Sequence, residues 1–168
     1  MPTLIELKDG VYRGIEDPFT HVGDDEELPQ GDVILSLTRF QSDGEALLSD
    51  GRSVGVLVKT DESVESLAYD LPRLAVVGLV ALNFPKYRDG RAYTNARLLR
   101  ERFKFAGQVR AVGDVLREQA GFMVRVGFDA FEPADGTGAQ QWEAATRRFR
   151  HVYQRAADDR EPAFAERE

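Results

Sequence analysis

The 168-residue chain contains no cysteine. This absence excludes a disulfide framework, a thiol nucleophile, an iron–sulfur cluster and a thiolate zinc site. Histidine is also scarce, because His21 and His151 are the only two and lie far apart in the chain. A histidine-rich metal site or a serine–histidine–aspartate triad is therefore not expected.

Long apolar runs are missing as well. No stretch approaches 18 uninterrupted apolar residues, so the sequence predicts no membrane span. Residues 1–6 lack a basic region followed by an apolar run, so we expect no secretory signal and a cytoplasmic location. The net charge of −7 argues against nucleic acid as a partner. The remaining composition, 42% hydrophobic and 30% charged, is that of a globular domain.

The charge is unevenly distributed along the chain. Residues 1–30 hold eight acidic and two basic side chains, whereas residues 86–125 hold ten basic and four acidic ones. Two interpretations of the basic segment are open. Its cations form ion pairs or coat a solvated helix face, or they form a site for an anion or an acidic partner.

Strand and helix patterns alternate along most of the sequence. Residues 4–8 and 11–13 predict a hairpin around Asp9 and Gly10, and residues 16–31 resemble a loop. We expect strands at 33–38, 54–58, 108–112 and 128–131, with another inside the apolar run 74–84. We expect helices at 42–49, 62–70, 94–103, 115–126 and 140–156, with Asp61, Thr94 and Asp114 as N-caps and Gly127 as a stop.

This alternation predicts an α/β fold with about five βα units in one mostly parallel sheet. The sheet is expected to be either open, as in flavodoxin, or a partial barrel, with a short N-terminal hairpin. Residues 1–157 are predicted to form a single α/β domain, and residues 158–168 a charged, disordered tail. Trp142 and Phe149 are expected in the core of the last helix rather than stacked on a cofactor.

The site is expected where parallel strands end, because ligands of such sheets bind beyond the C-terminal strand ends. The residues that follow the predicted strands include five cations and three carboxylates: Arg39, Lys59, Lys86, Arg88, Arg91, Asp89, Asp114 and Glu132. Asp114 and Glu132 are the candidates for an acid–base pair, and a helix cap and a solvated strand end are their plainer interpretations.

The loop 85–93 is the strongest local candidate, because it leads into a helix N-terminus. The sequence predicts that Lys86, Arg88, Arg91, Thr94 and Arg97 bind a small oxyanion such as sulfate, sulfite or phosphate. A turn with an ion pair at residues 88–91 is the plainer alternative. No P-loop and no Gly-x-Gly-x-x-Gly pattern occurs, so no cofactor is supported by a motif and no metal site is expected.

Four segments in the second half of the chain resemble one bacterial family. They are residues 83–94 (NFPKYRDGRAYT), 96–103 (ARLLRERF), 110–117 (RAVGDVLR) and 127–131 (GFDAF). Together they resemble the domain of unknown function 934 family, whose members are labelled oxidoreductases of sulfite reduction. The family motif falls on Lys86, Arg88, Asp89, Gly90, Arg91, Arg97, Arg100, Gly113, Asp114 and Asp129. Many members resemble Arg-Cys-Gly-Phe-Asp where this chain has Val126 as the second residue, which argues against a thiol-based mechanism.

The resemblance implies a role in assimilatory sulfate reduction, with sulfite reductase or a sulfonucleotide reductase as partner. It does not imply a mechanism, because electron transfer needs a cofactor or a redox side chain and neither is visible here. Three hypotheses follow: an accessory protein that docks on a pathway enzyme, a small enzyme or carrier that binds an oxyanion, and a cofactor-binding reductase subunit. A homodimer is compatible with each of them.

Overall fold

The computed structural model describes residues 3–68, 74 and 76–167. Its strands are β1 (Thr3–Lys8), β2 (Val11–Glu16), β3 (Phe19–Val22), β4 (Asp32–Ser36), β5 (Val54–Val58), β6 (Leu79–Phe84), β7 (Gln108–Gly113) and β8 (Ala130–Phe131). Its α-helices are α1 (Leu37–Ser49), α2 (Glu65–Ala68), α4 (Arg91–Arg97), α5 (Ala120–Val126) and α6 (Ala139–Thr146). A π-helical turn, Leu98–Arg102, extends α4, and 3₁₀ turns lie at Arg117–Gln119 and Ala165–Arg167.

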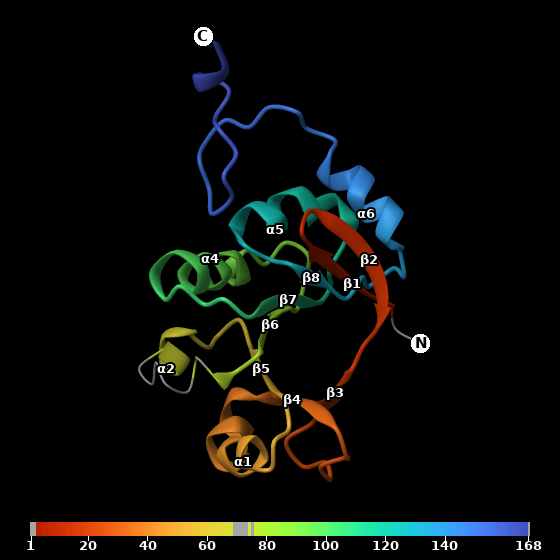
Figure 1. Ribbon diagram of the computed structural model, residues 1–168, viewed down its shortest axis with the longest axis vertical. Helices are drawn as coiled ribbons and strands as arrows, with labels where there is room; N and C mark the ends of the chain where they lie inside the picture. Colours follow the sequence, from red (N-terminus) through yellow and green to blue (C-terminus); the bar gives the residue numbers. More distant parts are fainter. Residues whose placement is uncertain (1–2, 69–73, 75, 168) are drawn as a thin grey trace.

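All eight strands belong to one sheet, in the order β2-β1-β8-β7-β6-β5-β4-β3. Neighbours from β3 to β8 run parallel, whereas β1 runs antiparallel to both β2 and β8. The sheet curls into a half barrel, and helices α1, α2, α4 and α5 follow one another along its outer side (Figure 1). The α/β class and the N-terminal hairpin are confirmed, and the curl matches the partial barrel rather than the open sheet. The expectations of a mostly parallel sheet and of about five βα units are not confirmed, and β1 and β2 are antiparallel strands.

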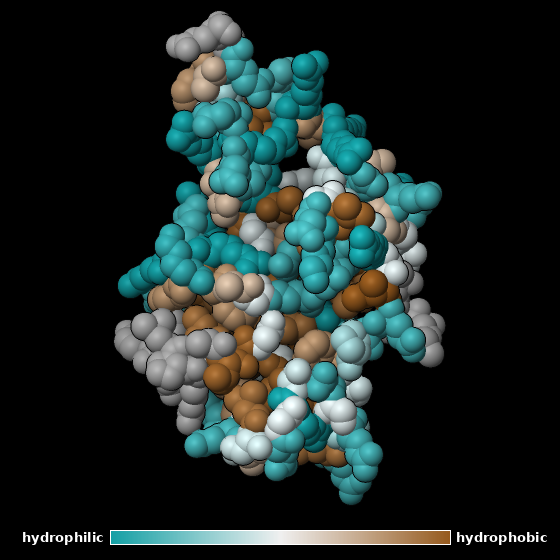
Figure 2. Space-filling model, in the orientation of Figure 1, coloured by the Kyte–Doolittle hydropathy of each residue, from teal (hydrophilic) through white to brown (hydrophobic). Residues whose placement is uncertain are grey.

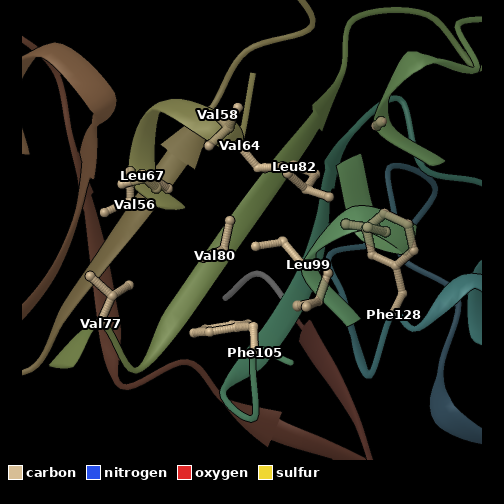
Figure 3. Close-up of a cluster of buried hydrophobic side chains, with 14 of the residues drawn as sticks. Val56, Val58, Val64, Leu67, Val77, Val80, Leu82, Leu99, Phe105 and Phe128 are labelled. Atoms are coloured by element: carbon tan, nitrogen blue, oxygen red, sulfur yellow. The ribbon is translucent and has the colours of Figure 1, made fainter. Parts of the chain in front are cut away.

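Alternation along the strands separates two apolar clusters, because successive side chains of a strand point to opposite faces. On β6, Val80 and Leu82 belong to the larger cluster under the helices, whereas Leu79 and Ala81 belong to a small cluster on the inner face. Figure 3 shows the larger cluster, with side chains of β5 and β6 directed toward Val64, Leu67 and Leu99. This two-sided burial explains why β6 is apolar at every position except Asn83.

The hairpin between β1 and β2 follows from its two turn residues. Asp9 and Gly10 have φ angles of 52° and 75°, the left-handed conformation that a tight two-residue hairpin turn requires. The hairpin joins the sheet through β8, with Ile5 opposite Phe131. The first strand of the chain thus lies beside the last.

The predicted loop 16–31 contains a strand, which corrects the sequence interpretation. Residues 19–22 form β3, which pairs in parallel with β4 and places His21 opposite Ile34. β3 is an edge strand with one neighbour, so most of its side chains stay at least partly exposed and its sequence lacks an apolar run. Because acidic residues follow β3 directly, the sequence of the whole segment resembled a loop.

The two N-caps expected at the C-terminal strand ends are wrong. Helix α4 begins at Arg91 with Gly90 as N-cap, and the Asp89 side chain accepts from the Arg91 amide at this point. Thr94 therefore lies inside the helix, four residues after the observed cap. Helix α5 begins at Ala120 with Gln119 as N-cap. Asp114 does not cap it, because its carboxylate accepts from the amide of Tyr87 instead.

Two further expectations concern the end of α5 and the extent of α2. The predicted stop of α5 is confirmed, since Gly127 is its C-cap with a φ of 110°. The helix expected over 62–70 is wrong at its start, because α2 begins only at Glu65 and Asp61 therefore does not cap it. The amide of Glu65 donates to the side chain of Ser63 instead, and the expected end at 69–70 lies outside the described residues. No helix in the described ranges is long and apolar enough to cross a bilayer.

The helix expected over 140–156 is wrong in its second half, because α6 ends at Thr146. Trp142 is fully buried, as expected, but Phe149 is 69% exposed and lies outside the core. Beyond Thr146, Phe149 and Tyr153 are largely exposed while Val152 is buried, so spacing alone does not extend the helix. The C-terminal segment instead folds back: Val152 bridges Pro162, and Asp158 pairs with Arg125.

Gly113, the last residue of β7, gives a direct test of how closely β7 packs against the end of β6. Its φ is 95°, and an added Cβ would overlap the carbonyl oxygen of Phe84 and lie 2.7 Å from Asn83 Oδ1. We expect Gly113→Ala to destabilise the fold by about 1–3 kcal/mol, measured by urea unfolding. Gly78→Ala, at a position with open space, is the matched control and should change stability by less than about 0.5 kcal/mol. Equal effects of the two changes would contradict the strained position.

Candidate anion-binding site

The loop between β6 and α4, residues 85–90, is anchored by its backbone. Asp114, just after β7, accepts from the amide of Tyr87 at 2.9 Å, and the side chain of Gln119 donates to the carbonyl oxygen of Tyr87. The Asp89 amide closes a turn on the carbonyl of Lys86 at 2.9 Å. The loop is therefore fixed to the neighbouring βα connection, and the basic side chains that it carries start from a defined backbone.

Two of the predicted anion contacts already have acidic partners. Arg91 donates to both carboxylate oxygens of Asp89, at 3.0 and 2.6 Å, and these hydrogen bonds lower the pKa of Asp89 to about 2. Arg97 pairs with Glu101 one helical turn further on, at 2.8 Å. The plainer interpretation of the loop, a turn with an ion pair, therefore describes its Arg91 side.

Lys86 and Arg88 remain available. Both are exposed, and within the described ranges neither has a carboxylate within ion-pair distance. Arg88 donates to the hydroxyl of Tyr87 at 2.6 Å and lies 5.3 Å from the centroid of that ring. Tyr87 itself is 43% exposed. The loop thus presents two cations and an aromatic ring outward.

The other cations predicted for this edge have separate surroundings. Arg39 lies in the first turn of α1, pairs with Asp43 and donates to the carbonyl of Gly23. Lys59 is exposed after β5, and its backbone amide donates to Glu62. No recorded contact joins either of them to Lys86 or Arg88 among the described residues.

Arg100 and Asp129, which the family resemblance includes, stabilise the fold. The Arg100 guanidinium donates to the carbonyls of Phe105, Gly107 and Gly127 and pairs with Asp129 at 3.0 Å. The Asp129 carboxylate also accepts from the amide of Val109 at 2.8 Å. Burial raises the pKa of Asp129, and the Arg100 charge and the amide oppose that rise. This pair joins the π-helical turn after α4 to β7 and to the start of β8.

Among the described residues, Arg110 forms the most buried ionic cluster, which the sequence analysis missed. It lies in the middle of β7, is fully buried, and pairs with Asp17 at 2.6 Å and with Glu132 at 2.9 Å. Glu132 also pairs with His21 at 2.8 Å. We call Asp17, His21, Arg110 and Glu132 the inner-face cluster, because Arg110 lies on the face of β7 opposite the larger core. Its only signal in the sequence is a charge inside an apolar strand.

The inner-face cluster also bears on metal binding. Ligand atoms of Asp17, His21 and Glu132 lie within 4.8 Å of one another. The Arg110 guanidinium already donates to both carboxylates, and thus supplies the positive charge that a metal ion would bring. The residues present therefore fit an ion-pair network better than a metal centre.

The two acid–base candidates have different partners. Asp114 anchors Tyr87, while Glu132 belongs to the inner-face cluster. Burial acts to raise the pKa of Glu132, but hydrogen bonds and charges from His21 and Arg110 outweigh it and hold the pKa below its ordinary value. Glu132 is thus a stabilised carboxylate, and no recorded contact joins it to Asp114 within the described part of the chain.

The fold and the site together define the class of protein: it is a mixed α/β protein with a half-barrel sheet and an anchored basic loop at the strand ends. The chain belongs to a bacterial family described as protein of unknown function (DUF934), whose model matches residues 55–164. This match confirms the family resemblance. It covers the basic loop, Arg100 and Asp129, and begins at β5, beyond Asp17 and His21. No curated protein matches the chain.

Proposed function

We propose that this chain is an accessory protein of assimilatory sulfate or sulfite reduction that docks on an acidic surface of a pathway enzyme. Lys86 and Arg88 are its contact residues. The observation that carries the proposal is the pair of exposed cations on an anchored loop without carboxylate partners of their own. The pathway comes from the family resemblance, and sulfite reductase and a sulfonucleotide reductase are the partners it implies.

The geometry favours an acidic protein surface over a small oxyanion. A small oxyanion is held by several donors that converge on one point. Here Arg91 and Arg97 are bound to Asp89 and Glu101, which leaves two outward-facing cations and an exposed tyrosine. Exposed arginine and tyrosine side chains are common contacts at protein interfaces.

The direct test measures binding of the purified chain to sulfite reductase and to the sulfonucleotide reductase at low and high salt. We expect the double change Lys86→Glu and Arg88→Glu to weaken binding about tenfold or more, because it reverses both contact charges. Binding of the unchanged chain should weaken with salt, since exposed charges are screened.

The matched control is the double change Lys8→Glu and Arg13→Glu on the β1–β2 hairpin, where both side chains are exposed. It alters the net charge equally and should change binding less than about twofold. Equal loss in the two double variants, or no binding to either reductase, would refute the proposal. Selective thermal stabilisation by sulfite or sulfate that depends on Arg88 would support the oxyanion carrier in its place.

A further inference from the structure

A cavity of about 680 Å³ lies between α5, α6 and the C-terminal segment. Its walls come from the 3₁₀ turn before α5, from one side of α5, from the end of α6 and from residues 148–160. Gly121 lies where α5 approaches α6, since an added Cβ would be 3.8 Å from Thr146 Cα. The volume is within the range of pockets that bind small organic molecules.

The cavity walls are strongly basic. Four arginines line it, namely Arg117, Arg125, Arg148 and Arg160, against one carboxylate, Glu118. The surface of the C-terminal segment, uppermost in the space-filling view, is mainly hydrophilic, whereas apolar surface gathers lower, over the middle of the sheet (Figure 2). A concave site lined by one sign of charge concentrates ligands of the opposite sign.

Two of these arginines bind the C-terminal segment that forms one wall of the cavity. Arg125 on α5 pairs with Asp158 at 3.1 Å, and Arg160 donates to the carbonyls of Phe149 and Arg150. Both contacts join the C-terminal segment to itself or to α5. They fix one wall of the cavity relative to the helices.

The other two arginines are available for a ligand. Within the described ranges, neither Arg117 nor Arg148 has a carboxylate within ion-pair distance. Arg117 acts on Asp135 only through its charge, as a minor influence on the pKa of that carboxyl. The Arg148 guanidinium also lies 5.7 Å from the centroid of the Phe149 ring. Guanidinium groups without carboxylate partners in the lining of one cavity suit an anionic ligand.

Two aromatic rings complete the lining. Phe122 is 57% exposed and Phe149 is 69% exposed, and both line the cavity. The Tyr93 ring packs edge-on against Phe122, with centroids 4.8 Å apart, and so holds that ring in place. Exposed rings at a concave site favour a ligand with a planar body.

We infer that this cavity binds a small planar organic anion of mononucleotide size. Arg117 and Arg148 contact its anionic group, and Phe122 and Phe149 contact its ring system. This site is separate from Lys86 and Arg88, and nothing in the family description assigns it. The rings favour an organic anion over an inorganic one, because an inorganic anion leaves both rings exposed.

The test uses adenosine 5′-monophosphate as the probe, with inorganic phosphate and adenosine as its two parts, in titration calorimetry on the full chain. We expect the nucleotide to bind at least about tenfold more tightly than either part. The double change Arg117→Ala and Arg148→Ala should weaken nucleotide binding about tenfold or more. Ala144→Phe, which fills the cavity from an exposed position of α6, should weaken it similarly.

Arg147→Ala is the matched control, because Arg147 pairs with Glu143 and does not line the cavity. It should change the affinity less than about twofold, and so should the Lys86→Glu and Arg88→Glu double variant. Circular dichroism checks that every variant is folded. The inference fails if the nucleotide does not bind, if phosphate binds equally well, or if the Arg147 and the Arg117–Arg148 variants bind alike.

Discussion

Arg110→Met is expected to lower the free energy of unfolding by about 3–5 kcal/mol, because it leaves two carboxylates without their buried cation. Arg110 is fully buried and donates to Asp17 through both terminal nitrogens, at 2.6 and 3.1 Å. Methionine keeps most of the side-chain volume, so the loss of stability reflects the missing charge and not an empty cavity. Urea unfolding followed by circular dichroism measures it.

Two further variants make this result interpretable. Arg97→Met removes an exposed ion pair with Glu101 and should cost less than about 1 kcal/mol. Adding Asp17→Asn and Glu132→Gln to Arg110→Met should restore part of the lost stability, because the carboxylates no longer carry unpaired charge. If Arg110→Met and Arg97→Met were equally mild, the inner-face cluster would not stabilise the fold.

The inner-face cluster also makes the free energy of unfolding depend on pH in the acid range. The pKa of Glu132 is lower in the folded chain than its ordinary value of 4.5, so Glu132 binds a proton more readily when the chain unfolds. Its contribution to stability is therefore present above pH 4.5 and is lost as the pH falls through the lowered value. In Glu132→Gln this part of the acid-induced decline should be absent from the pH dependence of urea unfolding.

Trp142→Ala is the second change with a large expected effect, about 3–5 kcal/mol. Trp142 is fully buried, its ring stacks on Phe131 with centroids 4.5 Å apart, and its indole nitrogen donates to Thr137 at 2.9 Å. Alanine at this position leaves a cavity between α6 and the sheet. Unfolding must be followed by circular dichroism, since Trp142 is the single tryptophan.

Tyr153→Ala is the control for the aromatic deletion. Tyr153 lies in the second half of the helix expected over 140–156, and in the structure it is 84% exposed. Its removal should change stability by less than about 0.5 kcal/mol. A large effect of Tyr153→Ala would mean that the C-terminal segment packs on the domain through this ring.

The contrast between these residues shows where sequence patterns are informative. Apolar runs predicted β5 and β6 because both faces of those strands are buried, and the Asp9-Gly10 pair predicted the hairpin because few residues adopt its φ angles. β3 was missed because an edge strand needs no apolar run. The helical spacing of apolar residues after Thr146 wrongly predicted a longer helix, because spacing does not reveal whether the side chains have a surface to pack on.

The site was less predictable than the fold for a related reason. The sequence predicted the loop with Lys86 and Arg88 as a candidate site, yet it could not show which of its cations are neutralised. Asp89 and Glu101 are close in sequence to Arg91 and Arg97, so those pairs were foreseeable as the plainer alternative. Asp17 lies 93 residues from Arg110, and only the curl of the sheet brings them together. The cavity beside α5 depends in the same way on a chain reversal that no local pattern specifies.

The placement of β1 beside β8 has a consequence for biosynthesis. A ribosome makes Glu6 long before Ala130, its partner in the sheet. At about 5–20 residues per second, roughly 6 to 25 s separate the two. Throughout that interval the hairpin has a free edge. The nascent chain therefore completes its sheet late, and agents that shield exposed strand edges during translation should raise the yield of folded protein.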